Sequence, residues 1–206
     1  QQVKVGHVEA GLRTFNKYFP FPEEMNRKLT GSLADLHFAP TMGSKNNLLR
    51  EGVNEADVYI TGNTVIDAMK HTVEENYVFE NDELNNIDFE NKKVIMITAH
   101  RRENWGQGIE NICEALNRIV DENEDVELVY LVHLNPVVKD VVTERLGGKD
   151  RVHLLPPLDT KETHNLMNKS FMVMTDSGGL QEEAPHLGKP VLVLRDVTER
   201  PEAVEA

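Results

Sequence analysis

The chain has 206 residues, enough for one large domain or two small ones, and its 28% charged and 39% apolar residues are typical of a globular protein. The net charge of -13 argues against general affinity for nucleic acid or an anionic membrane, although local groups can still bind phosphate. One cysteine, Cys113, excludes an internal disulfide framework, and no apolar run approaches the roughly 20 residues that span a bilayer. We expect a cytoplasmic protein without signal peptide or membrane span, and the abrupt ends of the sequence indicate a fragment of a longer chain.

Short apolar, β-branched runs alternate with helical patterns along the whole chain. The predicted strands cover residues 3–8, 37–39, 58–61, 93–98, 126–133, 152–155, 171–175 and 190–194. The predicted helices cover residues 63–75, 109–120, 136–146, 162–169 and 179–187, and another opens near 20–27. Several strands are almost entirely apolar, as in a parallel sheet covered on both faces. The alternation predicts an α/β fold with doubly wound sheets and right-handed crossovers.

One stretch interrupts this alternation. Residues 74–90 are rich in Glu, Asp and Asn and contain no Lys or Arg. We interpret residues 76–90 as an exposed acidic connector. It would join an α/β domain over residues 1–75 to a second α/β domain over residues 91–206.

Two polar segments lie in the first predicted domain. Residues 6–14, Gly-His-Val-Glu-Ala-Gly-Leu-Arg-Thr, follow a strand, where open α/β sheets bind ligands. Their carboxylate, imidazole and guanidinium could serve acid–base and anion-binding chemistry, or form only a polar loop with a salt bridge. Residues 20–27 open a helix with Glu23 and Glu24, and the helix dipole accounts for one of these. The functional alternative places Glu23 beside Glu9, where the two carboxyl pKa values would be pushed apart.

A third polar segment, residues 98–106, follows the first strand of the second predicted domain. An imidazole and two guanidiniums there, His100, Arg101 and Arg102, are suited to a diphosphate, although an ion pair between an arginine and Glu103 would be the structural explanation. His133 ends the neighbouring strand and is expected on the same rim, either as a functional or as a structural residue.

The fourth segment, residues 175–184, runs from a strand through Ser-Gly-Gly into a helix. Glycines let the backbone approach a phosphate closely, and Glu183 one turn later could accept hydrogen bonds from a ribose. A tight turn without ligand is the structural alternative. Arg200 could add to the phosphate site. The sequence contains neither a dinucleotide-binding G-x-G-x-x-G nor a P-loop motif, so nothing in it suggests NAD or a P-loop kinase.

Together these segments closely resemble the non-hydrolysing bacterial UDP-N-acetylglucosamine 2-epimerases. The matching strings, in order along the chain, are GHVEAGLRT, FPEEMNR, LTGSLADLHFAPT, ITGNTVIDA, TAHRRENWG, VHLNP, TDSGGLQEEAP and GKPVLVLRDVTERPE. The resemblance implies two Rossmann-like doubly wound domains in a glycosyltransferase-B-like arrangement, with the ligand in the interdomain cleft. It also implies a homodimer that is activated allosterically by UDP-GlcNAc.

The resemblance assigns roles to individual residues. Glu9, Glu23 and His100 match catalytic positions. The positions that hold the UDP phosphates and ribose are matched by Ser177, Gly178, Gly179, Glu183 and Arg200. Residues of the activating UDP-GlcNAc site are matched by Glu23, Arg101 and His133. Thr163 stands where relatives often carry an aromatic residue near the uracil.

By this resemblance the parent protein interconverts UDP-GlcNAc and UDP-ManNAc for cell-envelope polysaccharide, by elimination and readdition of UDP, with no metal or redox cofactor. The family's N-terminal part, including a catalytic aspartate, and its C-terminal helices are missing, so we expect this chain by itself to be inactive. The alternatives are a hydrolysing epimerase that releases ManNAc, a glycosyltransferase of similar fold, or a catalytically silent nucleotide-sugar-binding module. The joint presence of Glu9, Glu23 and His100 argues against the last.

Overall fold

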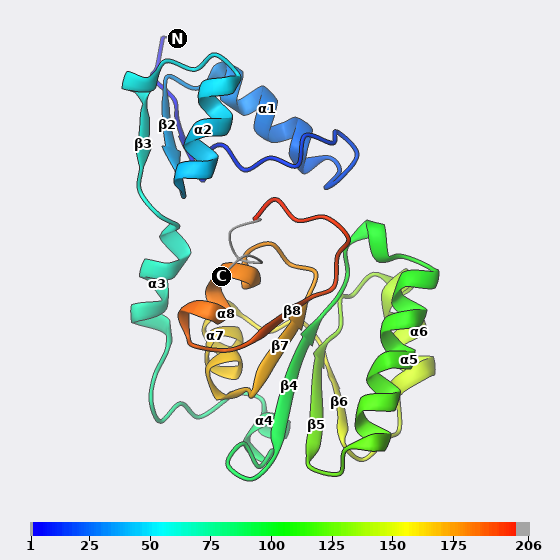
Figure 1. The fold of residues 1–206 in the computed structure, drawn as a ribbon. Helices are drawn as coiled ribbons and strands as arrows, with labels where there is room; N and C mark the ends of the chain where they lie inside the picture. Colours follow the sequence, from blue (N-terminus) through cyan, green and yellow to red (C-terminus); the bar gives the residue numbers. More distant parts are fainter. Residues whose placement is uncertain (1, 201–206) are drawn as a thin grey trace. The chain divides into compact units, whose positions relative to one another are not determined.

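The computed structural model describes residues 2–200, which form two compact units (Figure 1). The first unit contains the chain up to Ala68 together with the segment from Val197, and the second contains Met69–Asp196. Within residues 2–200, no helix combines the length and the apolar character needed to cross a membrane.

The first unit is built on a small parallel sheet, as the sequence predicts. Its elements in chain order are β1 (Gly6–Val8), α1 (Glu23–Leu33), β2 (Leu36–Ala39), α2 (Met42–Arg50), the 3-10 helix η1 (Glu55–Asp57) and β3 (Val58–Ile60), with strand order β1-β2-β3. The predicted strand over residues 3–8 begins later, at Gly6. The Val5 N–H donates to the Asp35 carboxylate at 2.8 Å, so Val5 is held by a side chain at the start of the ladder.

The second unit contains a larger sheet, also parallel throughout. Its strands are β4 (Lys93–Thr98), β5 (Val126–Leu131), β6 (Val152–Leu155), β7 (Met172–Thr175) and β8 (Val191–Val193). Its longer helices are α5 (Gln107–Glu122), α6 (Pro136–Leu146), α7 (Thr160–Lys169) and α8 (Leu180–His186). Figure 1 shows α5 and α6 on one face of this sheet and α7 and α8 on the other. The α/β fold class predicted from the sequence is confirmed.

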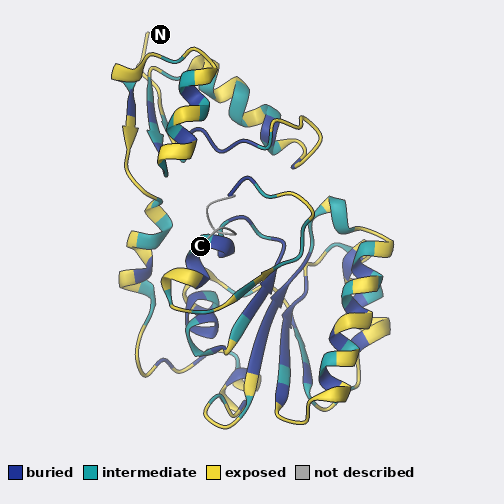
Figure 2. Ribbon diagram, in the orientation of Figure 1, coloured by how far each residue is buried: buried dark blue, intermediate teal, exposed yellow. Residues whose placement is uncertain are grey.

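Alternation along β4 explains why both faces are covered. Ile95 and Ile97 belong to the apolar cluster that includes α5 and α6, whereas Val94 and Met96 belong to the cluster that includes α7 and α8. All four side chains are buried, as the dark strands of Figure 2 show. Successive residues of a strand face opposite sides, so a nearly continuous apolar run indicates a sheet covered twice.

The strand order of the second sheet, β6-β5-β4-β7-β8, contains a reversal between β4 and β7. From β4 the chain builds outward through β5 and β6, and then continues on the other side of β4 with β7 and β8. The Thr98 and Thr175 hydroxyls, at the carboxyl ends of β4 and β7, lie 2.7 Å apart. In open α/β sheets such a switch point opens the crevice in which ligands bind.

The acidic segment after α3 (Thr64–Thr72) is not the exposed connector that its composition suggested. It contains a short helix, α4 (Asp82–Asn85), and its apolar side chains enter the core of the second unit: Tyr77, Phe79, Leu84 and Ile87 are buried. The Lys169 ammonium donates to the Tyr77 carbonyl at 2.8 Å and lies over the Phe79 ring. The acidic residues only occupy its outer surface, so the prediction of an exposed connector is wrong.

Candidate functional site

A pocket opens at the carboxyl edge of the second sheet, at the switch point. Its volume is about 180 Å³. Its lining residues end or follow β4, β5, β6 and β7 or lie on α7 and α8: Thr98, His100, Leu131, His133, Pro157, Leu158, Thr163, Ser177 and Leu180. The sequence predicted that His133 lies on the same rim as His100, and that Ser177 follows another strand. The structure brings these three residues together around one pocket.

A buried carboxylate holds the loop that carries His100. The Oδ2 atom of Asp176 accepts hydrogen bonds from the backbone N–H groups of His100 at 2.8 Å and Arg101 at 2.7 Å, and from the Asn104 side chain at 2.9 Å. Asp176 itself is completely buried. It therefore connects the loop after β4 to the turn after β7. Sequence analysis did not single out Asp176, although a carboxylate directly after an apolar strand was a visible signal.

The His100 imidazole lines this pocket. It stacks on the His133 ring with a centroid distance of 5.1 Å and an interplanar angle of 24°. Burial lowers the pKa of His100 below its usual value, the charges of His133 and Arg101 lower it further, and only Asp176 and a hydrogen bond oppose the shift. His100 is consequently neutral at neutral pH, and its ring can either donate or accept a hydrogen bond.

The Ser-Gly-Gly turn lies on the other side of the switch point. The Ser177 N–H donates to the Thr175 hydroxyl at 2.9 Å, which fixes the first residue of the turn. A Cβ on Gly179 would lie 2.8 Å from Oε1 of Glu183, so only glycine leaves this carboxylate in place. The turn thus brings a glycine-rich backbone and a carboxylate within one turn of helix of each other.

A buried histidine holds the Glu183 carboxylate from behind. Oε2 of Glu183 lies 3.2 Å from Nε2 of His164, whose other ring nitrogen lies 2.7 Å from the Thr72 hydroxyl. His164 is 2% exposed and Glu183 is 9% exposed. Sequence analysis missed His164, because a histidine within a helical pattern carries no signal of its own.

In the first unit, Glu9 follows β1 in an unusual backbone conformation. Its φ of 60° lies in the left-handed region, which costs a non-glycine residue roughly 1–2 kcal/mol. Gly11 follows with φ 89°, and a Cβ there would lie 2.2 Å from the Ser44 carbonyl oxygen. The tight turn leaves the Glu9 side chain partly exposed, with a side-chain exposure of 42%. Strained backbone of this kind is characteristic of functional sites.

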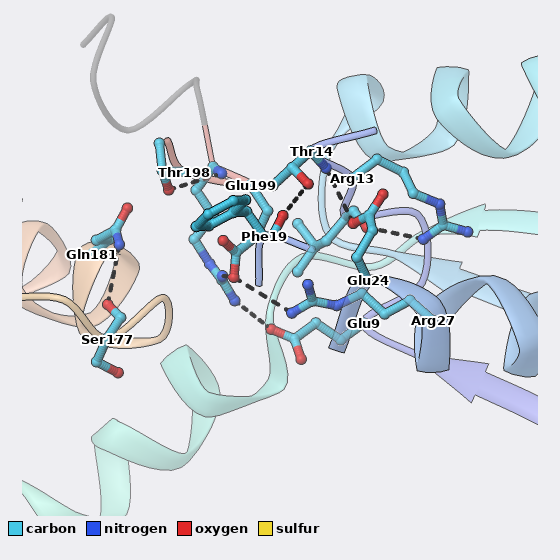
Figure 3. Close-up of polar contacts among 12 residues, drawn as sticks. Glu9, Arg13, Thr14, Phe19, Glu24, Arg27, Ser177, Gln181, Thr198 and Glu199 are labelled. Carbon is cyan, nitrogen blue, oxygen red and sulfur yellow. Dashed lines mark hydrogen bonds and ion pairs between the residues drawn. The ribbon is translucent and has the colours of Figure 1, made fainter. Parts of the chain in front are cut away.

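Glu9 is the first of four side chains of alternating charge that contact one another in a row within the first unit (Figure 3). The Arg200 guanidinium donates to Glu9 at 2.7 Å and to Glu199 at 2.9 Å, and Glu199 also pairs with Arg27 at 3.4 Å. Arg200 and Glu199 are both buried. The structure thus places Arg200, which the sequence suggested as a phosphate ligand, against a predicted catalytic carboxylate.

The two adjacent glutamates of α1 have different environments. Glu24 is fully buried, and its carboxylate accepts hydrogen bonds from the backbone N–H groups of Thr14 at 3.1 Å and Phe15 at 3.0 Å. Glu23 is only half-buried. Glu24 therefore has a structural role, which it fills through these hydrogen bonds, whereas the sequence had suggested the helix dipole as the reason. A pairing of Glu23 with Glu9 stays a prediction.

Other polar side chains of the predicted segments have structural partners. Arg13 donates through two nitrogens to Glu51 at 2.9 and 2.7 Å, and these bonds are the main reason that the Glu51 pKa is lowered. Glu103 pairs with Arg195 at 3.0 Å. The salt bridges that the sequence left open as alternatives are therefore present at Arg13 and at Glu103.

Parallel sheets with a pocket at a switch point are the architecture of α/β proteins that bind ligands at the strand ends. Compared with known families, the sequence matches the UDP-N-acetylglucosamine 2-epimerase family over residues 1–206. The chain belongs to this family. It is 82% identical over 206 residues to the putative UDP-N-acetylglucosamine 2-epimerase of Clostridium acetobutylicum, and 57% identical over 205 residues to the UDP-N-acetylglucosamine 2-epimerase of Bacillus subtilis.

The chain spans about half the length of these relatives: it is matched completely and covers 54% and 53% of them. Among solved structures, it resembles UDP-GlcNAc 2-epimerase from Neisseria meningitidis bound to UDP-GlcNAc, with a TM-score of 0.93, 49% identity, and coverage of 100% of this chain and 57% of the other. It also resembles S. aureus MnaA in complex with UDP, with a TM-score of 0.92, 55% identity, and coverage of 99% and 54%. The expected glycosyltransferase-B-like fold class agrees with these likenesses.

Proposed function

We propose that the protein to which this chain belongs interconverts UDP-GlcNAc and UDP-ManNAc by reversible epimerisation at C2. The observation that carries the proposal is the pocket at the switch point, where His100 and the Ser177 turn face one another across β4 and β7. Family membership and the relatives bound to UDP-GlcNAc or UDP support the choice of ligand.

In this proposal the second unit binds the UDP group. The Ser177, Gly178 and Gly179 backbone approaches the diphosphate, because the turn has no Cβ at its glycines. The nearly buried Glu183 carboxylate accepts hydrogen bonds from the ribose hydroxyls, which are donors of matching chemistry. Thr163 lines the same pocket and contacts the base with a smaller side chain than an aromatic residue would offer.

The chemistry must overcome a weakly acidic C2–H bond, which is not adjacent to a carbonyl group. A carboxylate removes the C2 proton while the C1–O bond breaks, and the bonding electrons of that bond leave with UDP to give a 2-acetamidoglucal. Readdition returns the UDP oxygen to C1 and a proton to the opposite face of C2. We assign these proton transfers to Glu9 and Glu23.

The departing diphosphate gains negative charge, so preorganised donors accelerate its departure. His100 is positioned as such a donor by the Asp176 anchor, and its neutral ring keeps one N–H group that can donate a hydrogen bond to the diphosphate. Arg200 contributes its positive charge after exchanging Glu9 for the phosphate. No step of this route requires a metal or a redox cofactor.

Activation by UDP-GlcNAc belongs to the proposal as well, with Glu23, Arg101 and His133 as the residues of a second site. The stacking of His133 on His100 gives this second site a direct connection to the reaction centre. We further propose a homodimer with its ligand between the two domains, and a product that feeds cell-envelope polysaccharide.

Proton NMR of the full-length protein with UDP-GlcNAc in D2O tests the proposal. We expect UDP-ManNAc with deuterium at C2. Release of UDP and free ManNAc would identify a hydrolysing epimerase instead, and an unchanged spectrum with retained UDP binding would identify a binding module. In the same assay Glu9→Gln should lower turnover much more than UDP affinity, and equal losses in both would assign Glu9 to binding.

A further inference from the structure

His164 lies on α7 behind the proposed ribose ligand and has both ring nitrogens engaged. Nε2 is 3.2 Å from a Glu183 oxygen, and Nδ1 is 2.7 Å from the Thr72 hydroxyl. A carboxylate can only accept, so the proton of a neutral ring lies on Nε2, and Nδ1 accepts from the threonine. Every polar atom of this buried imidazole is therefore used.

The Glu183 carboxylate is restricted from two sides. Its Oε2 is held by His164, and its Oε1 lies so close to Gly179 that a Cβ there would be 2.8 Å away. With an exposure of only 9%, the carboxylate has little room for other rotamers. It is held against the turn that we propose binds the nucleotide, and its remaining lone pairs are available to a donor from that side.

Asn165, the next residue on α7, holds Thr72 in place. The Asn165 side chain donates to the Thr72 carbonyl at 2.7 Å and accepts from the Glu74 N–H at 2.9 Å. These bonds fix the C-terminal end of α3 against α7, so the Thr72 hydroxyl stays within reach of His164. The histidine is thereby fixed from the side opposite to Glu183.

We propose that His164 is a positioning residue that holds the Glu183 carboxylate in place for the ribose hydroxyls of the nucleotide. The proposal rests on the proposed function, in which Glu183 accepts from the ribose. His164 does not touch the nucleotide itself. Its contribution is to prevent Glu183 from rotating away, so that the hydrogen bonds to the ribose form without loss of side-chain freedom.

The test is calorimetric titration of the full-length protein with UDP, 2′-deoxy-UDP and 3′-deoxy-UDP. In the unmodified protein, removal of a hydroxyl bound by Glu183 should weaken binding about tenfold to hundredfold, as expected for a hydrogen bond to a charged group. In His164→Leu the difference in affinity between UDP and the deoxy ligand should fall to about threefold or less. UDP then loses its hydrogen bond to Glu183, whereas the deoxy ligand has no such bond to lose. His164→Gln, whose amide can still donate to Glu183, should recover most of the penalty.

The outcomes separate the proposal from the function on which it rests. If the unmodified protein binds all three ligands equally, Glu183 does not bind the ribose hydroxyls, and both this role of Glu183 and the positioning role of His164 are overturned, whereas the epimerisation is tested separately by NMR. If it discriminates and His164→Leu discriminates equally well, only the positioning role is overturned. His186→Leu, an exposed histidine on α8, is the matched control and should leave the penalty unchanged. Should His164→Leu fail to fold, Thr72→Val removes the hydroxyl that orients the ring, and an unchanged penalty there overturns the proposal.

Discussion

The hydrogen bonds of Asp176 predict how strongly the loop after β4 depends on one side chain. In Asp176→Ala the backbone N–H groups of His100 and Arg101 lose their acceptor, at about 1–3 kcal/mol each. The Asn104 side chain also donates to the Leu194 carbonyl and keeps that hydrogen bond, so losing its bond to Asp176 costs less free energy. The variant no longer buries a carboxylate, and the desolvation free energy that is saved offsets part of the cost of the lost hydrogen bonds. We expect a net loss of about 3 kcal/mol, which corresponds to about 6–12 °C in melting temperature for a domain of this size.

The only tryptophan of the chain makes this loss measurable at the loop itself. The Trp105 indole donates to the His100 carbonyl at 3.1 Å, so its fluorescence reports the loop during urea unfolding. Asp176→Asn keeps one acceptor oxygen and should lose less than Asp176→Ala. Asp140→Ala, at an exposed position of α6, should stay within about 0.5 kcal/mol. A loss below about 1 kcal/mol in Asp176→Ala, with unchanged Trp105 emission, would refute the anchoring role.

Three further outcomes can be measured. Gly179→Ala puts a Cβ 2.8 Å from Glu183 Oε1, so calorimetry should show about tenfold weaker UDP binding; unchanged binding would contradict this. Glu24→Gln should lose about 1–3 kcal/mol in urea unfolding and Glu23→Gln should lose turnover instead, so the reverse pattern would disprove our assignment. Folding lowers the pKa of His100, so as the pH falls the unfolded chain takes up a proton at this residue before the folded chain does. The free energy of unfolding should therefore decrease as the pH drops below about 6.5. His100→Gln should flatten that slope, as measured by urea unfolding at several pH values.

Strand position and sheet type were predictable because burial on both faces leaves a clear pattern. The predicted strands 93–98 and 152–155 have the same limits in the structure as β4 and β6. The acidic segment was misinterpreted because its charged residues dominate the composition. Its four buried apolar residues, Tyr77, Phe79, Leu84 and Ile87, are spaced too irregularly to have indicated a core contact.

The site was predictable where chemistry follows directly on a strand. Polar residues after neighbouring parallel strands must meet at one edge, which is why His100 and His133 were expected together. Contacts between distant elements leave no such pattern. His164 reaches Glu183 19 residues away and Thr72 92 residues away, and only the packing of α7 brings the three together.

The burial of residues 76–90 has a practical consequence for dividing the protein. A second unit produced from Asn91 onward would lack the apolar side chains that cover one end of its core, namely Tyr77, Phe79, Leu84 and Ile87. The vacated surface would be a contiguous apolar patch, and such patches cause self-association and precipitation. A unit that starts at Met69 keeps this covering and should be the soluble, monodisperse form for crystallisation or ligand screening.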